Sequence, residues 1–267
     1  MRPIRCFGLT LFVAVALAAV GASGAMANPH WYECAKETGA KFEKGCSKEG
    51  GKGGYVLKEG IGKGKAFKGK GGAAILHNVI PGKGDIKIEC ASFKDSGAVA
   101  VPDKEFNVVA TFSKCKSLGA PCASGAKKET ITTAKLAGNL GWLNKAASKA
   151  GASLTSEAAP GTGYLAEFEC TGLAKVRVHG AVIGSIGPVG VVTKEAISSF
   201  AVGPYLGELS PGYTPLTNPP AFEEESVGVL LTELNSPETG NVWSPEGGLP
   251  SGQEATATNK GETLEIK

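Results

Sequence analysis

Apolar and polar residues alternate one by one along much of the chain. Four runs show this alternation most clearly: Ile86–Cys90, Phe106–Phe112, Tyr164–Cys170 and Val176–Val182. Successive side chains of a β-strand point to opposite faces, so a period of two predicts strands with one buried and one solvated face. Further candidate strands lie between clusters of Gly, Pro and Asn: Tyr55–Lys58, Ala73–Ile80, Ile131–Leu136, Ala196–Val202, Val227–Leu234, Ala255–Asn259 and Thr263–Lys267.

One segment, 141–149, favours a helix instead. Leu143, Ala146 and Ala147 are spaced as on a helix, and Gly151 suits its end. The rest of the chain is dominated by strands of even spacing with turn signals between them. We therefore predict an all-β fold, an antiparallel β-sandwich or barrel with long Gly/Pro-rich loops, at most one or two short helices, and bracing disulfides.

Residues 1–27 have the three-part order of an export signal. Arg2 and Arg5 give a positive start, Leu9–Val20 is almost continuously apolar, and Ala25-Met26-Ala27 fits the small-x-small cleavage rule. We expect cleavage after Ala27; the alternative is an uncleaved anchor, although the apolar run is short for a hydrocarbon core of roughly 30 Å. No later apolar stretch approaches spanning length. The sequence thus predicts a secreted, extracellular protein, released or loosely associated with the cell envelope.

The remaining segment, 28–267, has a suitable length for one all-β domain. Two similar passages, Ile88-Glu89-Cys90 and Phe168-Glu169-Cys170, each close an alternating run. They leave two interpretations open: two related sheet halves, about 73–150 and 151–267, or strands that look alike because all amphipathic strands do.

Six cysteines follow the signal segment: Cys34, Cys46, Cys90, Cys115, Cys122 and Cys170. An even number in an exported chain predicts three disulfides. Short turn-rich segments favour the pairs Cys34–Cys46 and Cys115–Cys122, which leaves Cys90–Cys170 by elimination. No pair has CxxC spacing and no histidine lies nearby, so we predict no metal site.

Charge is unevenly distributed along the chain. Residues 28–150 hold 21 basic and 11 acidic side chains, whereas 151–267 hold 5 and 14. The stretch Glu43–Gly72 combines many lysines with many glycines and is predicted to be a loop, as are the proline-rich stretches Pro204–Pro220 and Pro237–Gly252. Long loops on a rigid sheet are frequent binding elements.

The lysines of the first loop are the candidate binding residues: Lys52, Lys58, Lys63, Lys65, Lys68 and Lys70. Their charge favours an anionic envelope polymer, such as teichoic acid or polysaccharide, or another surface protein. Only Tyr55 and Phe67 interleave with them, which disfavours nucleic acid. The alternatives are a solvated loop, or a loop lying against the acidic C-terminal half. The leading hypothesis is a non-catalytic binding or structural module.

The alternative function is an extracellular hydrolase using strand-borne Glu167, Glu169 and His179, since a His–Glu pair can serve acid–base chemistry. The aspartates Asp85, Asp95 and Asp103 lie in turn-like contexts, where such side chains cap the backbone. The spacing Gly64–Lys70 approaches a phosphate-binding loop, but Gly71 replaces the required hydroxyl residue. We therefore expect no cofactor.

Several short phrases of the chain stand out: Trp31–Cys34, Gly45–Gly51, Cys122 with Ser124–Lys127, Leu136–Lys145, Ala166–Cys170, Gly180–Gly184 and Thr258–Lys267. Together they resemble a family of predicted secreted proteins, of unassigned function, from high-GC Gram-positive (actinobacterial) soil bacteria. The resemblance spans most of 28–267, and Leu136–Lys145 and Thr258–Lys267 are its most specific parts. It implies a secreted bacterial protein and carries over no activity, cofactor or catalytic residue.

Overall fold

The described part of the chain folds entirely into β-structure. The computed structural model describes residues 28–50, 53–60, 64–80, 84–100, 102–160, 163–202, 221–223, 230–235, 243 and 249–267. Its strands are β1 (Trp31–Lys36), β2 (Tyr55–Glu59), β3 (Lys65–Ile80), β4 (Gly84–Cys90), β5 (Ser92–Ala100), β6 (Lys104–Ser113), β7 (Lys116–Ser117), β8 (Ala120–Ala123), β9 (Thr130–Thr132), β10 (Leu136–Asn144), β11 (Lys149–Ser156), β12 (Tyr164–Cys170), β13 (Ala174–Gly187), β14 (Thr193–Val202), β15 (Leu230–Asn235) and β16 (Leu249–Ile266). The expected signal segment 1–27 and the loop 204–220 lie outside the described residues.

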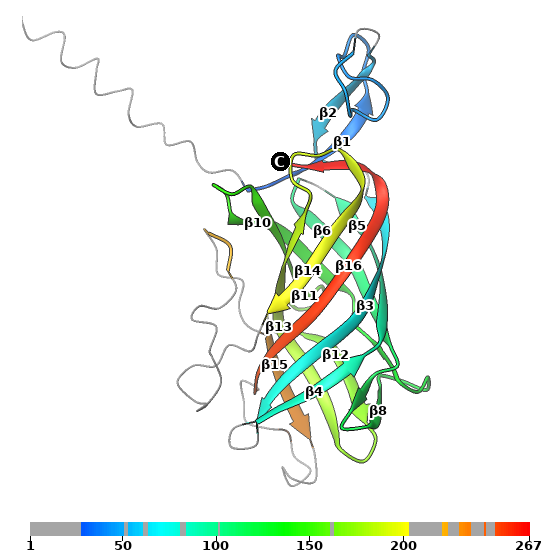
Figure 1. Cartoon of the computed structure of the whole chain (residues 1–267), viewed down its shortest axis with the longest axis vertical. Helices are drawn as coiled ribbons and strands as arrows, with labels where there is room; N and C mark the ends of the chain where they lie inside the picture. The colour runs from blue at the N-terminus through cyan, green and yellow to red at the C-terminus, as the bar shows by residue number, and fades with distance from the viewer. Residues whose placement is uncertain are drawn as a thin grey trace, which may run out of the picture.

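One large antiparallel sheet closes partly into a ring, so the predicted all-β class is confirmed in its barrel-like form (Figure 1). Antiparallel pairs connect β3, β5, β6, β10, β11, β13, β14 and β16, and β16 returns to β3. Strands from 73–150 and from 151–267 therefore share one sheet. A closed sheet leaves few unpaired edges, which protects it from pairing with other chains.

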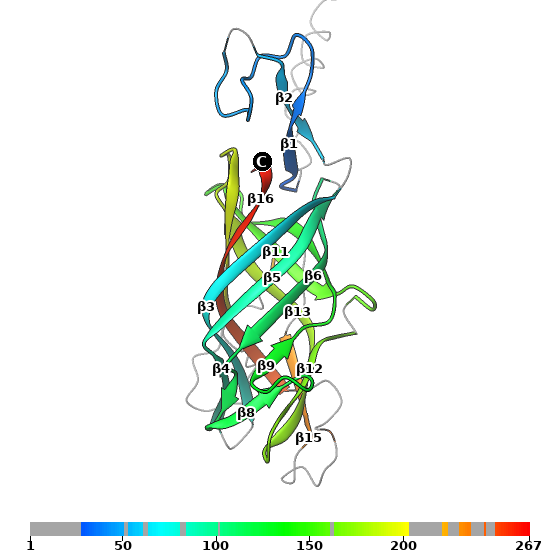
Figure 2. The ribbon, with the colours of Figure 1, turned by 90° about the vertical axis from the view of Figure 1, so that its right-hand side faces the viewer.

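Three long strands, β3, β13 and β16, run through the whole length of the ring (Figure 2). At the far end, β4, β7, β8, β12 and β15 continue the sheet between them. At the other end, the β1–β2 hairpin projects beyond the ring, and β16 ends beside it (Figure 1). We call this the hairpin end.

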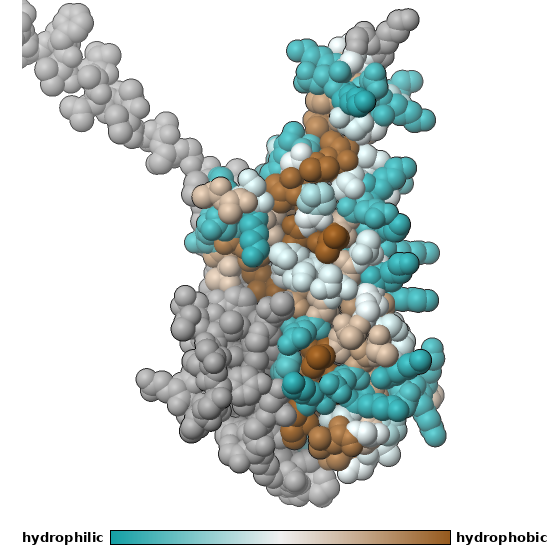
Figure 3. Space-filling model, viewed as in Figure 1, coloured by the Kyte–Doolittle hydropathy of each residue, from teal (hydrophilic) through white to brown (hydrophobic). Residues whose placement is uncertain are grey.

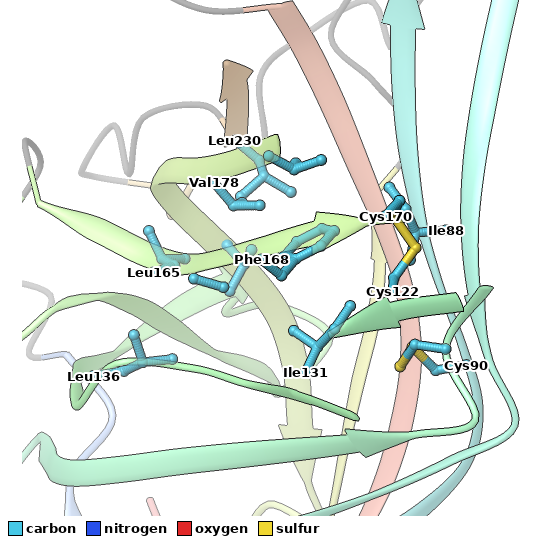
Figure 4. Packing of buried hydrophobic residues seen from close by; sticks show 14 of the residues in the cluster. Ile88, Cys90, Cys122, Ile131, Leu136, Leu165, Phe168, Cys170, Val178 and Leu230 are labelled. Carbon is cyan, nitrogen blue, oxygen red and sulfur yellow. A yellow bond between two sulfur atoms is a disulfide. The ribbon is translucent and has the colours of Figure 1, made fainter. Parts of the chain in front are cut away.

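The core fills the inside of the ring because inward side chains alternate with outward ones. In β12 and β13, Phe168, Val176 and Val178 are buried, and their sequence neighbours are more exposed. Phe168 packs with Leu165, Ile131 and Ile88 in the largest cluster (Figure 4). The strands predicted at 86–90, 164–170 and 176–182 are thus confirmed. Their predicted buried faces are also found, except that Tyr164 is exposed and Leu165 is buried, because the register shifts between Tyr164 and Ala166. Among the described residues no helix has the length and apolar character needed to cross a membrane.

The predicted helix at 141–149 is wrong, because this segment forms the end of β10, the turn 145–148 and the start of β11. Trp142 lies opposite Ala150 in the ladder, and Asn144 lies opposite Lys149. The Asn144 side-chain oxygen accepts a hydrogen bond from the Ala147 backbone N–H at 2.7 Å, which closes the turn. The local helical spacing is weaker than the pairing of two strands that both contribute buried side chains.

The structure has three disulfides, of which one was correctly predicted. Cys34–Cys46 is confirmed and closes the loop of the β1–β2 hairpin. The predicted pairs Cys90–Cys170 and Cys115–Cys122 are wrong; the bonds are Cys90–Cys115 and Cys122–Cys170. Sheet pairing explains the difference, because Cys122 lies directly opposite Cys170, and the β4–β7 pair brings Cys90 next to Cys115. Three disulfides indicate an oxidising compartment.

Candidate functional site

The outer surface of β3 carries lysines that meet further lysines on both neighbouring strands. Lys68 and Lys70 point outward and are exposed, and the intervening Gly69 points into the ring. Lys70 lies directly opposite Lys94 of β5, and Lys68 lies directly opposite Lys260 of β16. We call these four residues, Lys68, Lys70, Lys94 and Lys260, the lysine face. Figure 3 shows hydrophilic side chains projecting along the edge of the molecule formed by β3 and β16.

The lysine face contains two like-charged pairs in adjacent rows. Directly opposed residues of an antiparallel pair have Cβ atoms about 5 Å apart, and like charges there are destabilising. Lys260 is balanced by an ion pair with Glu195. Within the described part of the chain, Lys68, Lys70 and Lys94 have no ion pair. The sheet therefore presents a rigid group of uncompensated positive charges.

The other predicted lysines lie elsewhere. Lys65 lines the hairpin end of the ring, where its ammonium is 3.7 Å from the Glu33 carboxylate. Lys58 is exposed on β2, opposite Glu33 in the register. Lys52 and Lys63 lie outside the described residues. Of the four predicted lysines that the structure describes, it brings two together, and it adds two that sequence reasoning missed.

The prediction that Glu43–Gly72 is one loop is wrong for residues 55–59 and 65–72, which form strands. Glycine in this segment reflects close packing inside the ring. A Cβ atom on Gly69 would lie 1.8 Å from the Asp95 carboxylate and 2.0 Å from the Asn259 side chain. Gly69 therefore has no room for a side chain, and a glycine at an inward position conceals the apolar–polar alternation in the sequence.

Glu167, one of the residues of the hydrolase hypothesis, is engaged in an ion pair on the outer face of the sheet. Arg177 donates a hydrogen bond to its carboxylate at 2.7 Å, which raises the pKa of the arginine. The same guanidinium lies over the rings of Trp243 and Tyr164, at 4.1 and 5.0 Å from their centres. This arrangement is typical of a surface contact between strands.

The structure does not bring His179 together with both carboxylates of that hypothesis. Glu169 lies opposite Lys175, four residues along β13 from His179, which corresponds to about 13 Å. The His179 Nε2 atom is 3.7 Å from the Glu233 carboxylate, too far for a hydrogen bond. A shallow hollow is lined by both Glu167 and Glu169, but His179 is not part of it. The structure does not assemble the proposed acid–base group.

A second candidate site lies inside the ring at the hairpin end. Here a cavity of about 50 Å³ has a largely apolar wall, which includes six large side chains: Trp31, Phe67, Val99, Ile186, Leu264 and Ile266. We call it the mouth pocket, because the exposed residues Val191 and Glu262 also line it. The carboxyl group of Glu105 belongs to the same lining. Sequence reasoning did not single out this residue.

Glu105 is a buried acid to which the described residues supply no hydrogen-bond or ion-pair partner. Its residue is 8% exposed, and it forms no hydrogen bond or ion pair within the described part of the chain. Burial raises its pKa to about 7, and the charge of Asp95 contributes in the same direction. Buried carboxyl groups in native proteins usually have partners, so an exception points to function.

Asp95 lies deeper in the ring, between the mouth pocket and a second cavity of about 110 Å³ that is lined mainly by apolar side chains. Burial raises its pKa to about 6. With its amide nitrogen facing the acid, Asn259 donates to both Asp95 oxygens at 3.1 and 3.2 Å and accepts from Ser198 at 2.8 Å. Asp95 therefore sits inside a strand and faces the ring interior, whereas we expected a turn.

Comparison of the chain with protein-family models, with curated proteins and with solved structures gives no match. Among the described residues, no group of three or more His, Cys, Asp or Glu side chains is arranged to hold a metal ion. What the protein binds must therefore be inferred from the lysine face and the mouth pocket themselves.

Proposed function

We propose that this protein works outside the cytoplasm as a non-catalytic binding protein that holds an anionic polymer on its lysine face. The oxidising compartment indicated by the three disulfides supports the location, and an export signal at 1–27 would deliver the chain there. In this proposal the protein is secreted and loosely associated with the cell envelope.

The observation that carries the proposal is the pair of opposed lysines in two adjacent rows, Lys70 with Lys94 and Lys68 with Lys260. The Lys70–Lys94 pair costs stability in the free protein, whereas Glu195 offsets the charge of Lys260 in the other row. An anionic ligand placed over both rows relieves the remaining repulsion. Because the lysines stand on a hydrogen-bonded sheet, binding orders less backbone than it would on a flexible loop.

The neighbours of the lysines favour a phosphate- or carboxylate-bearing polymer over nucleic acid. Ser96, Thr258 and Ile197 lie beside the lysines in the two rows, and none of them offers an aromatic ring for base stacking. Binding through about four cationic contacts is salt-sensitive: affinity falls by about 100-fold between roughly 50 and 200 mM salt.

The test is binding of purified glycerol-phosphate teichoic acid to the disulfide-bonded protein, measured by isothermal titration calorimetry. A lysine near an anionic surface contributes about 1 kcal/mol, so replacing Lys68, Lys70 and Lys94 together by Gln lowers the affinity by roughly 100-fold. Unchanged affinity in this variant contradicts the proposal.

The matched control removes three equally exposed charges from another surface: Lys127→Gln, Lys128→Gln and Lys135→Gln. It has the same net charge as the first variant, and we expect it to keep most of the affinity. Equal losses in the two variants would mean that net charge alone attracts the polymer, and would remove the lysine face from the proposal.

A further inference from the structure

The mouth pocket combines an apolar wall, a buried acid and an opening to solvent. Its six apolar side chains leave Glu105 as the one carboxyl group that is both buried and part of the lining among the described residues. Asn259 makes no hydrogen bond to Glu105, because its amide is bonded to Asp95 and Ser198. Among the described residues the Glu105 carboxyl group therefore has no hydrogen-bond donor paired with it, and the buried Trp31 Nε1–H of the same lining is a donor that is not bonded to it.

We infer that the mouth pocket binds a small organic ammonium ion, with Glu105 as its counter-ion. An anionic ligand would be repelled by the carboxylate, and a purely apolar one would leave that acid unpaired at the same cost as in the empty pocket. An ammonium group satisfies the carboxylate, and its alkyl part contacts the apolar wall. The rings of Trp31 and Phe67 in that wall add an attraction for cations.

The dimensions of the pocket limit the ligand. A cavity volume of about 50 Å³ exceeds the roughly 10–15 Å³ that one water molecule needs on the same measure, and it suits a small ammonium head group. Longer alkyl chains must extend toward the exposed Val191 and the outer rim. The ligand is therefore a small amine whose ammonium group enters the pocket and whose remaining atoms lie at the outer rim.

Charges of the rim largely cancel one another. Three lysines and two glutamates line the opening: Lys65, Lys194, Lys260, Glu195 and Glu262. Lys65 pairs with Glu33 and Lys260 with Glu195, so neither ammonium is placed against Glu105. From the deeper side, Asp95 adds a negative charge that repels anions and favours a cation.

Binding is coupled to loss of one proton. A neutral Glu105 must release its proton to solvent before it can pair with an ammonium ion. Because the pKa of Glu105 is raised to about 7, affinity increases about tenfold per pH unit up to that value and then becomes constant. The rim groups and Asp95 named above are the other charged groups facing the site.

The experiment uses the intact, disulfide-bonded protein and n-butylammonium, with n-butanol as a neutral probe of the same shape. Calorimetry in buffers of different ionisation enthalpy measures the affinity and the proton release at pH 5.5 to 8, taken as roughly one unit either side of the raised pKa. We expect saturable binding of n-butylammonium, at least about 30-fold weaker binding to Glu105→Gln, and no proton release from that variant.

Two further variants keep the test decisive. Glu105→Asp retains the charge and should bind more weakly with the same pH dependence, which a merely misfolded variant would not do. Glu89→Gln removes an exposed carboxylate at the far end and should bind as the unsubstituted protein does. No saturable binding to the unsubstituted protein, or equal binding to Glu105→Gln, overturns the inference.

Discussion

Replacing Glu105 by Gln should change how the stability of the protein depends on pH. The carboxyl group ordinarily titrates near 4.5, and burial raises its pKa to about 7 in the folded state. A factor of ten in proton affinity corresponds to about 1.4 kcal/mol, so ionising Glu105 costs the folded protein roughly 3 kcal/mol relative to the unfolded chain. This cost disappears when the side chain is an amide of the same shape.

The sign follows from the raised pKa. The folded state holds the proton more tightly than the unfolded one, so the contribution of Glu105 is most favourable below pH 4.5 and is lost as the pH rises to about 7. The pKa of Asp95 is raised to about 6, so Asp95 also lowers the stability of the folded protein as the pH rises, but at lower pH. Because Asp95 is present in both proteins, its contribution does not distinguish them. The variant should therefore gain stability over the unsubstituted protein as the pH rises.

The assay is urea unfolding between roughly pH 4 and pH 8 with the disulfides intact, followed by circular dichroism. The free energy of unfolding of Glu105→Gln, minus that of the unsubstituted protein, should increase by roughly 3 kcal/mol over this range. Glu89→Gln, an exposed carboxylate, should show almost no such increase. A difference that stays constant with pH to within about 1 kcal/mol would refute the reasoning.

Two further predictions concern the covalent and steric framework of the ring. Peptide mapping without reduction should recover Cys122 linked to Cys170, and recovery of either cysteine in another bond contradicts the structure. Replacing both cysteines by Ala should lower the free energy of unfolding by about 4 kcal/mol, because the bond joins residues with a sequence separation of 48. Gly69→Ala should cost about 2 kcal/mol because its Cβ would overlap two side chains, whereas Gly72→Ala, with nothing within 4 Å, should cost almost nothing. Equal unfolding midpoints for the two glycine variants would show that the inner face of β3 is not tightly packed.

The sequence alone was informative wherever the signal was local. Period-two alternation identified the strands at 86–90, 164–170 and 176–182 and, apart from Tyr164, their buried faces, since that pattern depends only on neighbouring residues. The even cysteine number identified three disulfides, and the short Cys34–Cys46 loop gave one correct pair. The export signal and the family resemblance stay predictions.

Only the tertiary structure decided which strands pair and where each side chain ends up. Cys170 meets Cys122, Lys70 meets Lys94 and Lys68 meets Lys260 because the register of separate strands places them opposite each other. Glu105 is one acid among many in the sequence, and it becomes a buried, unpaired carboxyl only when the ring closes around it. Local patterns determine which face of a strand is buried, but contacts between distant segments depend on the free energy of the whole closed sheet, which no short window of sequence contains.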